Sequence, residues 1–198
     1  MADDPVLLDR AAACYVEAGE PAEAARCYHD AGSYRRAADL YSQVGLYREA
    51  ADAYARARMH DFAIWHLAHY VGDVAGARAL ESTGQPPGDP RQLRWRLAVA
   101  RCDIADHRSD SGPLGVLADA CRYLERPLAH HDPYVESWAA AIATAMRRED
   151  QVALLYAAGV RGHYDGAAER WAAWSRDTLH CELILPVAEP GPAKTPAY

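Results

Sequence analysis

The sequence predicts an all-α protein: a right-handed α-solenoid of stacked short helical hairpins that continues into longer C-terminal helices. Two observations carry this prediction, a repeated helical phrase and an unusual composition. Hydrophobic residues make up 51% of the 198 residues, yet alanine supplies much of that share, and one phenylalanine stands against 12 tyrosines and 5 tryptophans. Such a chain packs helix backbones closely over small residues and fills the remaining gaps with aromatic rings.

The repeat is a 13-residue unit in the first part of the chain. Six rows keep register without an insertion; they are residues 8–20, 21–33, 34–46, 47–59, 60–72 and 73–85. One column of these rows is Ala11, Ala24, Ala37, Ala50, Ala63 and Gly76. A second column is Tyr15, Tyr28, Tyr41, Tyr54, Leu67 and Leu80. A third column holds Gly19, Gly32 and Gly45, breaks at Arg58 and Val71, and has glycine again at Gly84. Repetition of this kind is typical of solenoids and other repeat architectures.

Each row has the pattern of one short helix followed by one turn. In the second row, Ala24, Ala25 and Tyr28 lie at helical spacing and share one face. Pro21 suits the first turn of a helix, and Gly32 suits the left-handed residue that ends one. Because a helix of about ten residues is marginal alone, its neighbours must stabilise it. We therefore expect the alanine column to permit close approach of helices and the tyrosine column to fill the space between them.

The phrase A-x-x-Y-x-x-x-G-x-Y-x-x-A runs through the third and fourth rows. Its fixed residues here are Ala38, Tyr41, Gly45, Tyr47 and Ala50. In this phrase, and over residues 8 to 84, the chain resembles the tetratricopeptide-like superfamily of helical repeats. A standard repeat of that family has about 34 residues for two helices, whereas two rows here make only 26, so these helices are shorter. The resemblance implies a scaffold for protein–protein interaction and no particular chemistry.

The chain divides into four regions in this interpretation. The short-helix repeat region is 1–84, a Pro/Gly breaker is 85–90, a longer-helix region is 91–180, and an extended segment with a mobile Pro-rich tail is 181–198. Five amphipathic helices are expected in the later part, over residues 90–106, 114–126, 132–148, 149–159 and 164–179. The phrase GLYREAADAY of residues 45–54 returns there as GHYDGAAERW at 162–171. We therefore expect the later helices to stack by the same rule as the rows.

Charge and cysteine content exclude several classes of partner and location. The formal net charge is −7 and lysine is scarce, which argues against a nucleic-acid partner. No window approaches the run of about 20 apolar residues that a membrane span needs, and the start MADDPVLLDR has no signal-peptide core. Five cysteines without a CxxC pair fit reduced thiols in the cytoplasm. Cys14 and Cys27 share one column, and we expect both to be small core residues.

Motifs for catalysis, metal binding and cofactor binding are missing from the sequence. There is no P-loop, G-x-S-x-G elbow, H-E-x-x-H or paired-cysteine signature. His66 and His69 are three residues apart on one predicted helix, with His60 a turn or more away, and HHDP at 130–133 precedes another helix. A metal site needs three or four ligands with supporting partners. We therefore expect no metal, no cofactor and no enzyme activity.

Five residues that open the third and fourth rows are the candidate protein-binding positions. They are large or polar-tipped and stand outside the alanine and tyrosine stripe: Tyr34, Arg35, Arg36, Tyr47 and Arg48. Tyrosine and arginine are favoured at the energetic centres of interfaces. The alternative is that the two tyrosines pack under the preceding turn and the arginines only solvate the surface.

The sequence thus favours a non-enzymatic helical-repeat adaptor, cytoplasmic and bacterial, that binds a protein or peptide. A second interpretation is a structural or regulatory subunit of a larger assembly. Its stacking faces would also bind identical copies, so a homo-oligomer is an alternative to a complex with another protein. The C-terminal stretch AAERWAAWSRDTLHCELILP is similar to bacterial proteins encoded beside MoxR-type ATPases and von Willebrand-like domains in conflict systems. A third interpretation is a ligand-sensing or catalytic helical protein with its site in residues 90–180.

Overall fold

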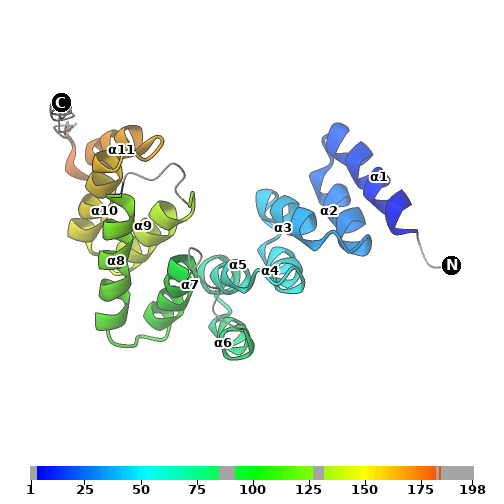
Figure 1. Ribbon diagram of the computed structural model, residues 1–198, viewed down its shortest axis with the longest axis horizontal. Helices are drawn as coiled ribbons and strands as arrows, with labels where there is room; N and C mark the ends of the chain where they lie inside the picture. Colours follow the sequence, from blue (N-terminus) through cyan, green and yellow to red (C-terminus); the bar gives the residue numbers. More distant parts are fainter. Residues whose placement is uncertain (1–3, 85–91, 127–131, 182, 184–198) are drawn as a thin grey trace, which may run out of the picture. The chain divides into compact units, whose positions relative to one another are not determined.

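The protein is all-helical in the part of the chain that the structure describes. A computed structural model describes residues 4–84, 92–126, 132–181 and 183, and these residues form eleven α-helices and one π-helical segment, with no strand among them (Figure 1). The expected all-α class is therefore confirmed for these ranges. The chain divides into two compact units, Met1–Asp110 and Ser111–Tyr198.

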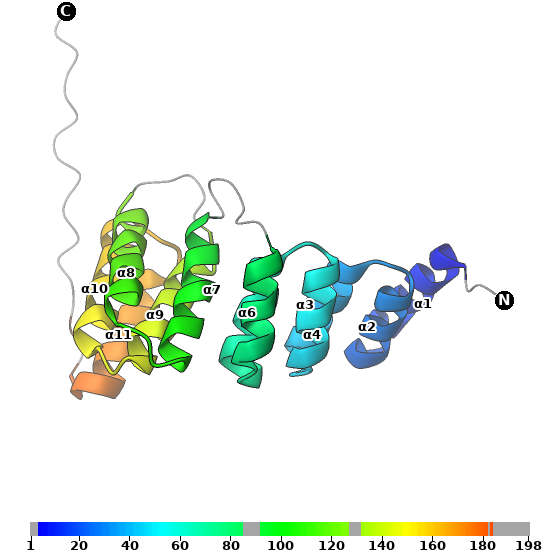
Figure 2. The same cartoon turned by 90° about the horizontal axis from the view of Figure 1, so that it is seen from below.

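Unit 1 contains one helix for each 13-residue row and one further helix. Its elements are α1 (Pro5–Glu17), α2 (Pro21–Asp30), α3 (Tyr34–Gln43), α4 (Tyr47–Arg56), α5 (His60–Trp65), the π-helix η1 (His66–Val71), α6 (Val74–Thr83) and α7 (Gln92–Ala105). From α2 to α5 the first residues are 13 apart, as the rows predict. From α1 to α5, each helix packs on the next one in sequence, and Figure 2 shows the helices of this unit side by side.

The turn between rows is the same in each of the first four rows. After α2, the Gly32 N–H donates to the His29 carbonyl (3.0 Å) and the Ser33 N–H donates to the Tyr28 carbonyl (2.8 Å), which together make a Schellman motif. This motif needs a left-handed residue, and the residues in that place are Gly19, Gly32, Gly45 and Arg58, with φ between 60° and 79°. Arg58 therefore replaces glycine in this column but keeps the left-handed backbone conformation.

The fifth row departs from the pattern because η1 contains one extra residue. The left-handed position moves from Val71 to Gly72 (φ 76°), and α6 begins at Val74 after the N-cap residue Asp73. Gly84 does not restore the turn either, since its backbone is extended (φ −79°, ψ 150°). A Cβ added at Gly84 would lie 2.7 Å from His60 Nδ1 and 2.8 Å from the Leu80 carbonyl oxygen. Glycine at this position therefore allows close approach of the surrounding groups.

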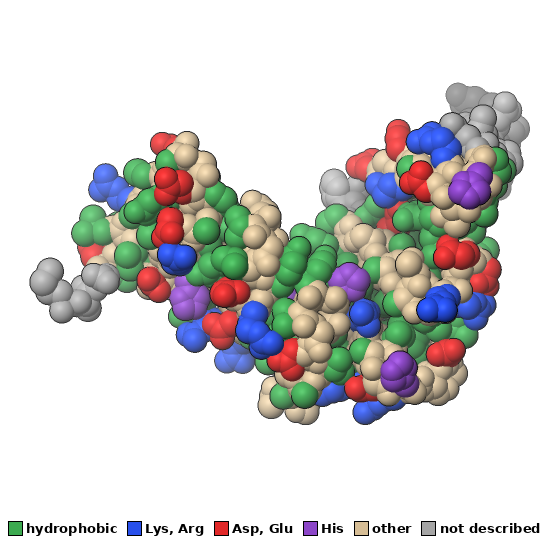
Figure 3. Space-filling model, turned by 180° about the vertical axis from the view of Figure 1, so that it is seen from behind, with side chains coloured by type: hydrophobic (Ala, Val, Ile, Leu, Met, Phe, Trp, Pro, Cys, Tyr) green, Lys and Arg blue, Asp and Glu red, His purple; other side chains and the backbone are tan. Residues whose placement is uncertain are grey.

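The alanine and tyrosine columns are buried in the inner rows, as expected. Ala24, Ala37, Ala50 and Ala63 are inaccessible to solvent, and Tyr28, Tyr41, Tyr54 and Leu67 are at most 9% exposed. The adjacent column is buried in all six rows: Ala12, Ala25, Ala38, Ala51, Ile64 and Ala77. The outer rows differ, because Tyr15 of the first row is 38% exposed and Leu80 of the sixth row is only partly buried. Hydrophobic side chains are visible at the surface beside the N-terminal residues in Figure 3.

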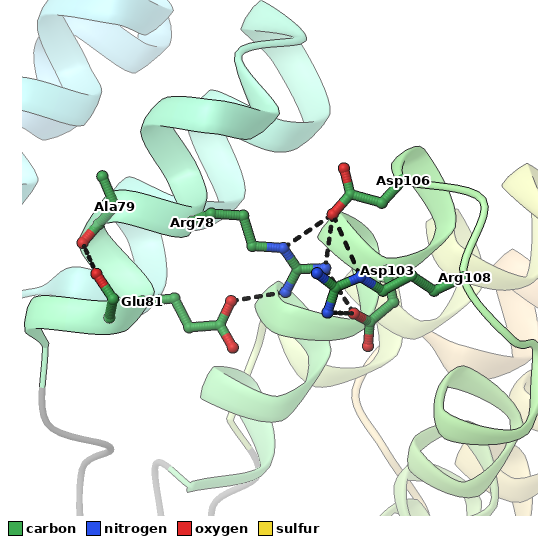
Figure 4. A network of polar contacts seen from close by, with 7 residues as sticks. Arg78, Ala79, Glu81, Asp103, Asp106 and Arg108 are labelled. Carbon is green, nitrogen blue, oxygen red and sulfur yellow. Dashed lines mark hydrogen bonds and ion pairs between the residues drawn. The ribbon is translucent and has the colours of Figure 1, made fainter.

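The helix α7 belongs to unit 1 and is held there by polar contacts. Arg78 of α6 reaches Asp103 (2.6 Å) and Asp106 (3.0 Å) of the α7 region, and it also pairs with Glu81 on its own helix (2.6 Å) (Figure 4). A second pair joins α5 to α7. The boundary between compact units thus falls after Asp110, one helix later than the Pro/Gly segment 85–90, which lies outside the described residues.

Unit 2 contains the four remaining helices, α8 (Ser111–Leu124), α9 (Val135–Ala145), α10 (Glu149–Arg161) and α11 (Ala167–Leu179). The central helix α10 contacts α8, α9 and α11. In the repeated phrase, Ala167 and Trp171 are buried with Ala157 and Val160, whereas Ala168 is exposed. Only part of the row pattern is therefore reused here.

The extended segment expected at 181–186 is described only at Cys181 and Leu183. The Leu183 carbonyl accepts a hydrogen bond from Trp171 Nε1 (2.6 Å), and its N–H donates to Ser175 Oγ (3.1 Å). This residue therefore lies along α11, and the rest of the expected segment lies outside the described residues. The Pro-rich tail lies outside the described residues.

Candidate protein-binding surfaces

The five predicted binding residues fall into two separate groups. Tyr34, Arg35 and Arg36 lie in the first turn of α3, and Tyr47 and Arg48 lie in the first turn of α4. Because α3 and α4 form a helical hairpin with a three-residue link, their first turns lie at opposite ends of the pair. The structure therefore brings the first three residues together and separates them from the other two.

Tyr47 and Arg48 make contacts with other helices of the same unit. The Tyr47 ring stacks on Tyr70 of η1, with ring centroids 4.3 Å apart and an interplanar angle of 13°. Arg48 forms an ion pair with Asp73, the N-cap residue of α6 (3.1 Å). That carboxylate also accepts the Gly76 N–H, and these hydrogen bonds lower the pKa of Asp73. Tyr47 therefore joins α4 to η1 in the next row, and Arg48 joins it to the start of α6 two rows along the chain.

The first turn of α3 presents a more open group of side chains. Arg36 pairs with Asp9 of α1 (3.0 Å), and the Arg56 guanidinium lies 5.7 Å above the Tyr34 ring. Arg35 is exposed, and among the described residues it has no hydrogen-bond or ion-pair partner. Arg35 is thus a cation in this group that is free to bind an external anion.

Two open depressions meet at this turn. The first, of about 340 Å³, is lined by Gly32, Ser33, Tyr34, Arg35, Arg36 and Ala57. The second, of about 440 Å³, shares Ser33 and Arg36 with the first and extends to Pro5, Val6, Asp9, Arg10 and Ala31. We call the two together the Ser33 furrow. The sequence pattern indicates Tyr34, Arg35 and Arg36 of this furrow, and it does not indicate Arg10, Ser33 or Asp9.

The start of α3 adds a second feature that favours anions. Its N-cap residue Ser33 makes no side-chain capping bond, and its hydroxyl lies toward α1, where it donates to Asp9 Oδ1 (2.8 Å). The first N–H groups of a helix have no partner within the helix, and they carry the positive end of the helix dipole. A carboxylate placed in the furrow beside Ser33 can therefore accept from these N–H groups and pair with Arg35.

A histidine and a serine in unit 1 have the mutual geometry of a base and a hydroxyl nucleophile. His66 Nδ1 donates to the Phe62 carbonyl (2.8 Å), which leaves Nε2 to accept from Ser42 Oγ at 3.0 Å. The residue is only 5% exposed, however, and the rings of Tyr54 and Tyr70 lie within 5.3 Å of its centroid. We interpret this pair as a bond that holds η1 to α3.

Burial of the histidines predicts a loss of stability at mildly acidic pH. Burial lowers the pKa of His66 and of His69 below the ordinary 6.5, and the Arg101 charge lowers that of His69 further. The unfolded chain therefore takes up protons near pH 6.5 that the folded chain resists, so stability is full above pH 6.5 and falls as the pH drops below it. We expect a lower urea midpoint at pH 5.5 than at pH 7.5.

The control for this pH effect is the double substitution His66→Gln and His69→Gln. It lowers stability at both pH values by removing buried contacts, but the difference between pH 7.5 and pH 5.5 should shrink. An unchanged difference would assign the pH dependence to other groups.

The histidines and cysteines do not form a metal cluster in the described part of the chain, where no group of three or more His, Cys, Asp or Glu could hold an ion. His69 Nδ1 accepts from Arg101 (3.2 Å). The HHDP histidines lie outside the described residues. All five cysteines are free, and burial raises the pKa of Cys102 to about 11, which makes it unreactive. Cys14 is exposed, so its assignment to the core was wrong; it lies on a face of α1 that none of the described helices covers.

No helix among the described residues is long and apolar enough to cross a membrane.

Comparison with known proteins does not indicate what these surfaces bind. Comparison of the chain finds no matching family model, no matching curated protein and no matching solved structure. Over its described residues the chain is an all-helical protein in which the adjacent helices of each unit pack together.

Proposed function

We propose that this protein is a non-enzymatic, cytoplasmic helical-repeat scaffold of tetratricopeptide-like character, with unit 1 forming a short-row, right-handed α-solenoid. Its Ser33 furrow binds a segment of a partner protein that carries a carboxylate. The observation that supports this function most is the open, uncapped first turn of α3 beside Arg35, which has no ion-pair partner among the described residues. Sequential packing of α1 to α5 supports the solenoid.

The chemistry of the furrow indicates the kind of segment that fits. Its cationic side chains are Arg10, Arg35 and Arg36, and its one carboxylate, Asp9, is already occupied by Ser33 and Arg36. The remaining wall is formed largely by apolar or small residues: Pro5, Val6, Ala31, Gly32 and Ala57. An acidic side chain next to an apolar one matches both parts. Because the protein as a whole is acidic, with a net charge of −7, this local positive site also gives orientation to an approaching partner.

Paired peptides test this function without knowledge of the natural partner. An array of ten-residue peptides is made in matched forms that differ only by Glu or Gln at the centre, and it is probed with labelled protein. We expect a subset of Glu peptides to bind at least about tenfold better than their Gln forms, which corresponds to roughly 1.4 kcal/mol. The preference should weaken as salt is raised.

The matched variants are Arg35→Glu in the furrow and Arg48→Glu in the first turn of α4. The first should abolish the preference for Glu peptides, and the second should keep it. Both arginines are exposed, and the melting temperature of each variant checks that the fold is intact. Equal loss in the two variants, or no preference in the unaltered protein, would contradict the assignment of the furrow.

A further inference from the structure

The outer face of α1 is a stacking face that none of the described helices of unit 1 covers. In the inner rows, the alanine and tyrosine columns are buried against neighbouring helices. In α1 the matching residues are open, since Ala11 is only partly buried and Cys14 and Tyr15 are exposed. The next column, at Ala12, is completely buried by α2. The helix α1 thus has the same kind of packing residues as the inner rows, but those on its outer face are exposed to solvent.

The open stripe has the pattern of a short coiled-coil seam. Leu7, Ala11, Cys14 and Ala18 are separated by four, three and four residues, which places them at alternating d and a positions of a heptad. Leu7 is 60% exposed. All four are small or apolar, so a second helix can approach closely. A repeat face that needs no partner is expected to be polar instead.

The charged residues that flank this seam indicate which kind of helix fits against it. Arg10 and Glu17 each precede an a position, so both occupy g positions on the same flank of α1. Both are exposed, and neither has an ion-pair partner among the described residues. In an antiparallel helix pair g positions meet g positions, whereas in a parallel pair they meet e positions. Two copies of α1 packed antiparallel therefore place Arg10 of each copy beside Glu17 of the other.

We infer that this face binds a second copy of the chain, through an antiparallel pair of α1 helices related by a two-fold axis. The interface is isologous, because the same stripe serves both copies. Two helices of this length bury less than the roughly 1,200 Å² of a standard interface, so the dimer is weak. We expect it to form at protein concentrations of about 10 µM to 1 mM.

Sedimentation equilibrium over that concentration range, with exchanged charges, tests the pairing. Arg10→Glu should weaken the dimer about tenfold because it faces Glu17 of the other copy, and adding Glu17→Arg to the same chain should restore it. Both sites are exposed, so the melting temperature should stay unchanged. A protein that stays monomeric up to about 1 mM overturns the inference, and so does an unaltered dimer in the single variant.

Disulfide trapping gives an independent readout of the orientation. In the antiparallel register Ala11 lies opposite Cys14 of the other copy. In a Cys181→Ser background, Ala11→Cys should therefore give a covalent dimer on mild oxidation, and adding Cys14→Ser should abolish it. Persistence of the dimer after Cys14→Ser would show a parallel pair and contradict the inference. Arg35→Glu should leave self-association intact, so failure of the furrow assignment and failure of the dimer are distinguishable.

Discussion

Replacing Tyr54 by alanine should destabilise the protein by about 3–5 kcal/mol, the range found when a buried aromatic side chain is removed. The Tyr54 residue is 3% exposed, and its ring lies 5.0 Å from the rings of both Phe62 and His66. Its hydroxyl donates to Asp39 Oδ1 (2.8 Å). The substitution leaves a cavity between rows and removes this bond. Urea unfolding followed by circular dichroism measures the change.

Two matched substitutions separate the causes of this loss. Tyr54→Phe keeps the ring and removes the hydroxyl, so it should cost only about 1 kcal/mol. Tyr15→Ala alters the same column in the first row, where the side chain is exposed, and should cost about 1 kcal/mol or less. A cost for Tyr15→Ala as large as that for Tyr54→Ala would show that the column does not stack as described.

The second large effect is expected at the buried ion pair between α5 and α7. Arg94 Nε donates to Asp61 Oδ2 (2.5 Å), and both side chains are at most 9% exposed. The guanidinium also lies 4.5 Å from the Phe62 ring centroid. Asp61→Ala leaves this buried charge without its carboxylate, so we expect a loss of about 3–5 kcal/mol in the free energy of unfolding.

The controls for this prediction are a double variant and an exposed pair. Asp61→Leu combined with Arg94→Met removes both charges and should recover most of the lost stability. Asp52→Ala breaks the pair with Arg56 (2.8 Å), in which both side chains are at least half exposed, and should cost about 0.5 kcal/mol or less. A loss below about 1 kcal/mol for Asp61→Ala would mean that solvent reaches this pair.

The sequence was sufficient for the row boundaries because each boundary has a local chemical signal. Glycine at Gly19, Gly32 and Gly45 marks the left-handed residue of the turn, and buried alanine and tyrosine recur at fixed distances from it. These signals depend on residues a few positions apart. They therefore predict where each short helix begins and ends without knowledge of the tertiary structure.

The π-helical segment η1 had no such signal. Row 60–72 has the same length as the other rows in the sequence pattern. In the structure this repeat is one residue longer, because the left-handed position moves from Val71 to Gly72. Arg58 also takes the left-handed conformation without being glycine. In both places the surrounding packing decides the backbone, and residue type does not reveal it.

The candidate site was predicted only in part because it depends on helices two rows apart. Asp9 meets Ser33 and Arg36 at separations of 24 and 27 residues, and Arg48 meets Asp73 at 25. These contacts depend on how alternate helices approach one another in space. Sequence periodicity placed Tyr34 and Tyr47 in equivalent row positions, yet equivalent positions in consecutive antiparallel helices lie at opposite ends.

One 13-residue packing rule builds the first four rows of unit 1 and leaves both the Ser33 furrow and the outer face of α1 open. The backbone Cα chemical shifts in solution test it most directly. We expect helical shifts over Pro21–Asp30, Tyr34–Gln43 and Tyr47–Arg56, interrupted at Gly32, Gly45 and Arg58, where φ is positive. Unbroken helical shifts across residues 31–33 or 44–46, or the absence of helical shifts from any of the three segments, would contradict it.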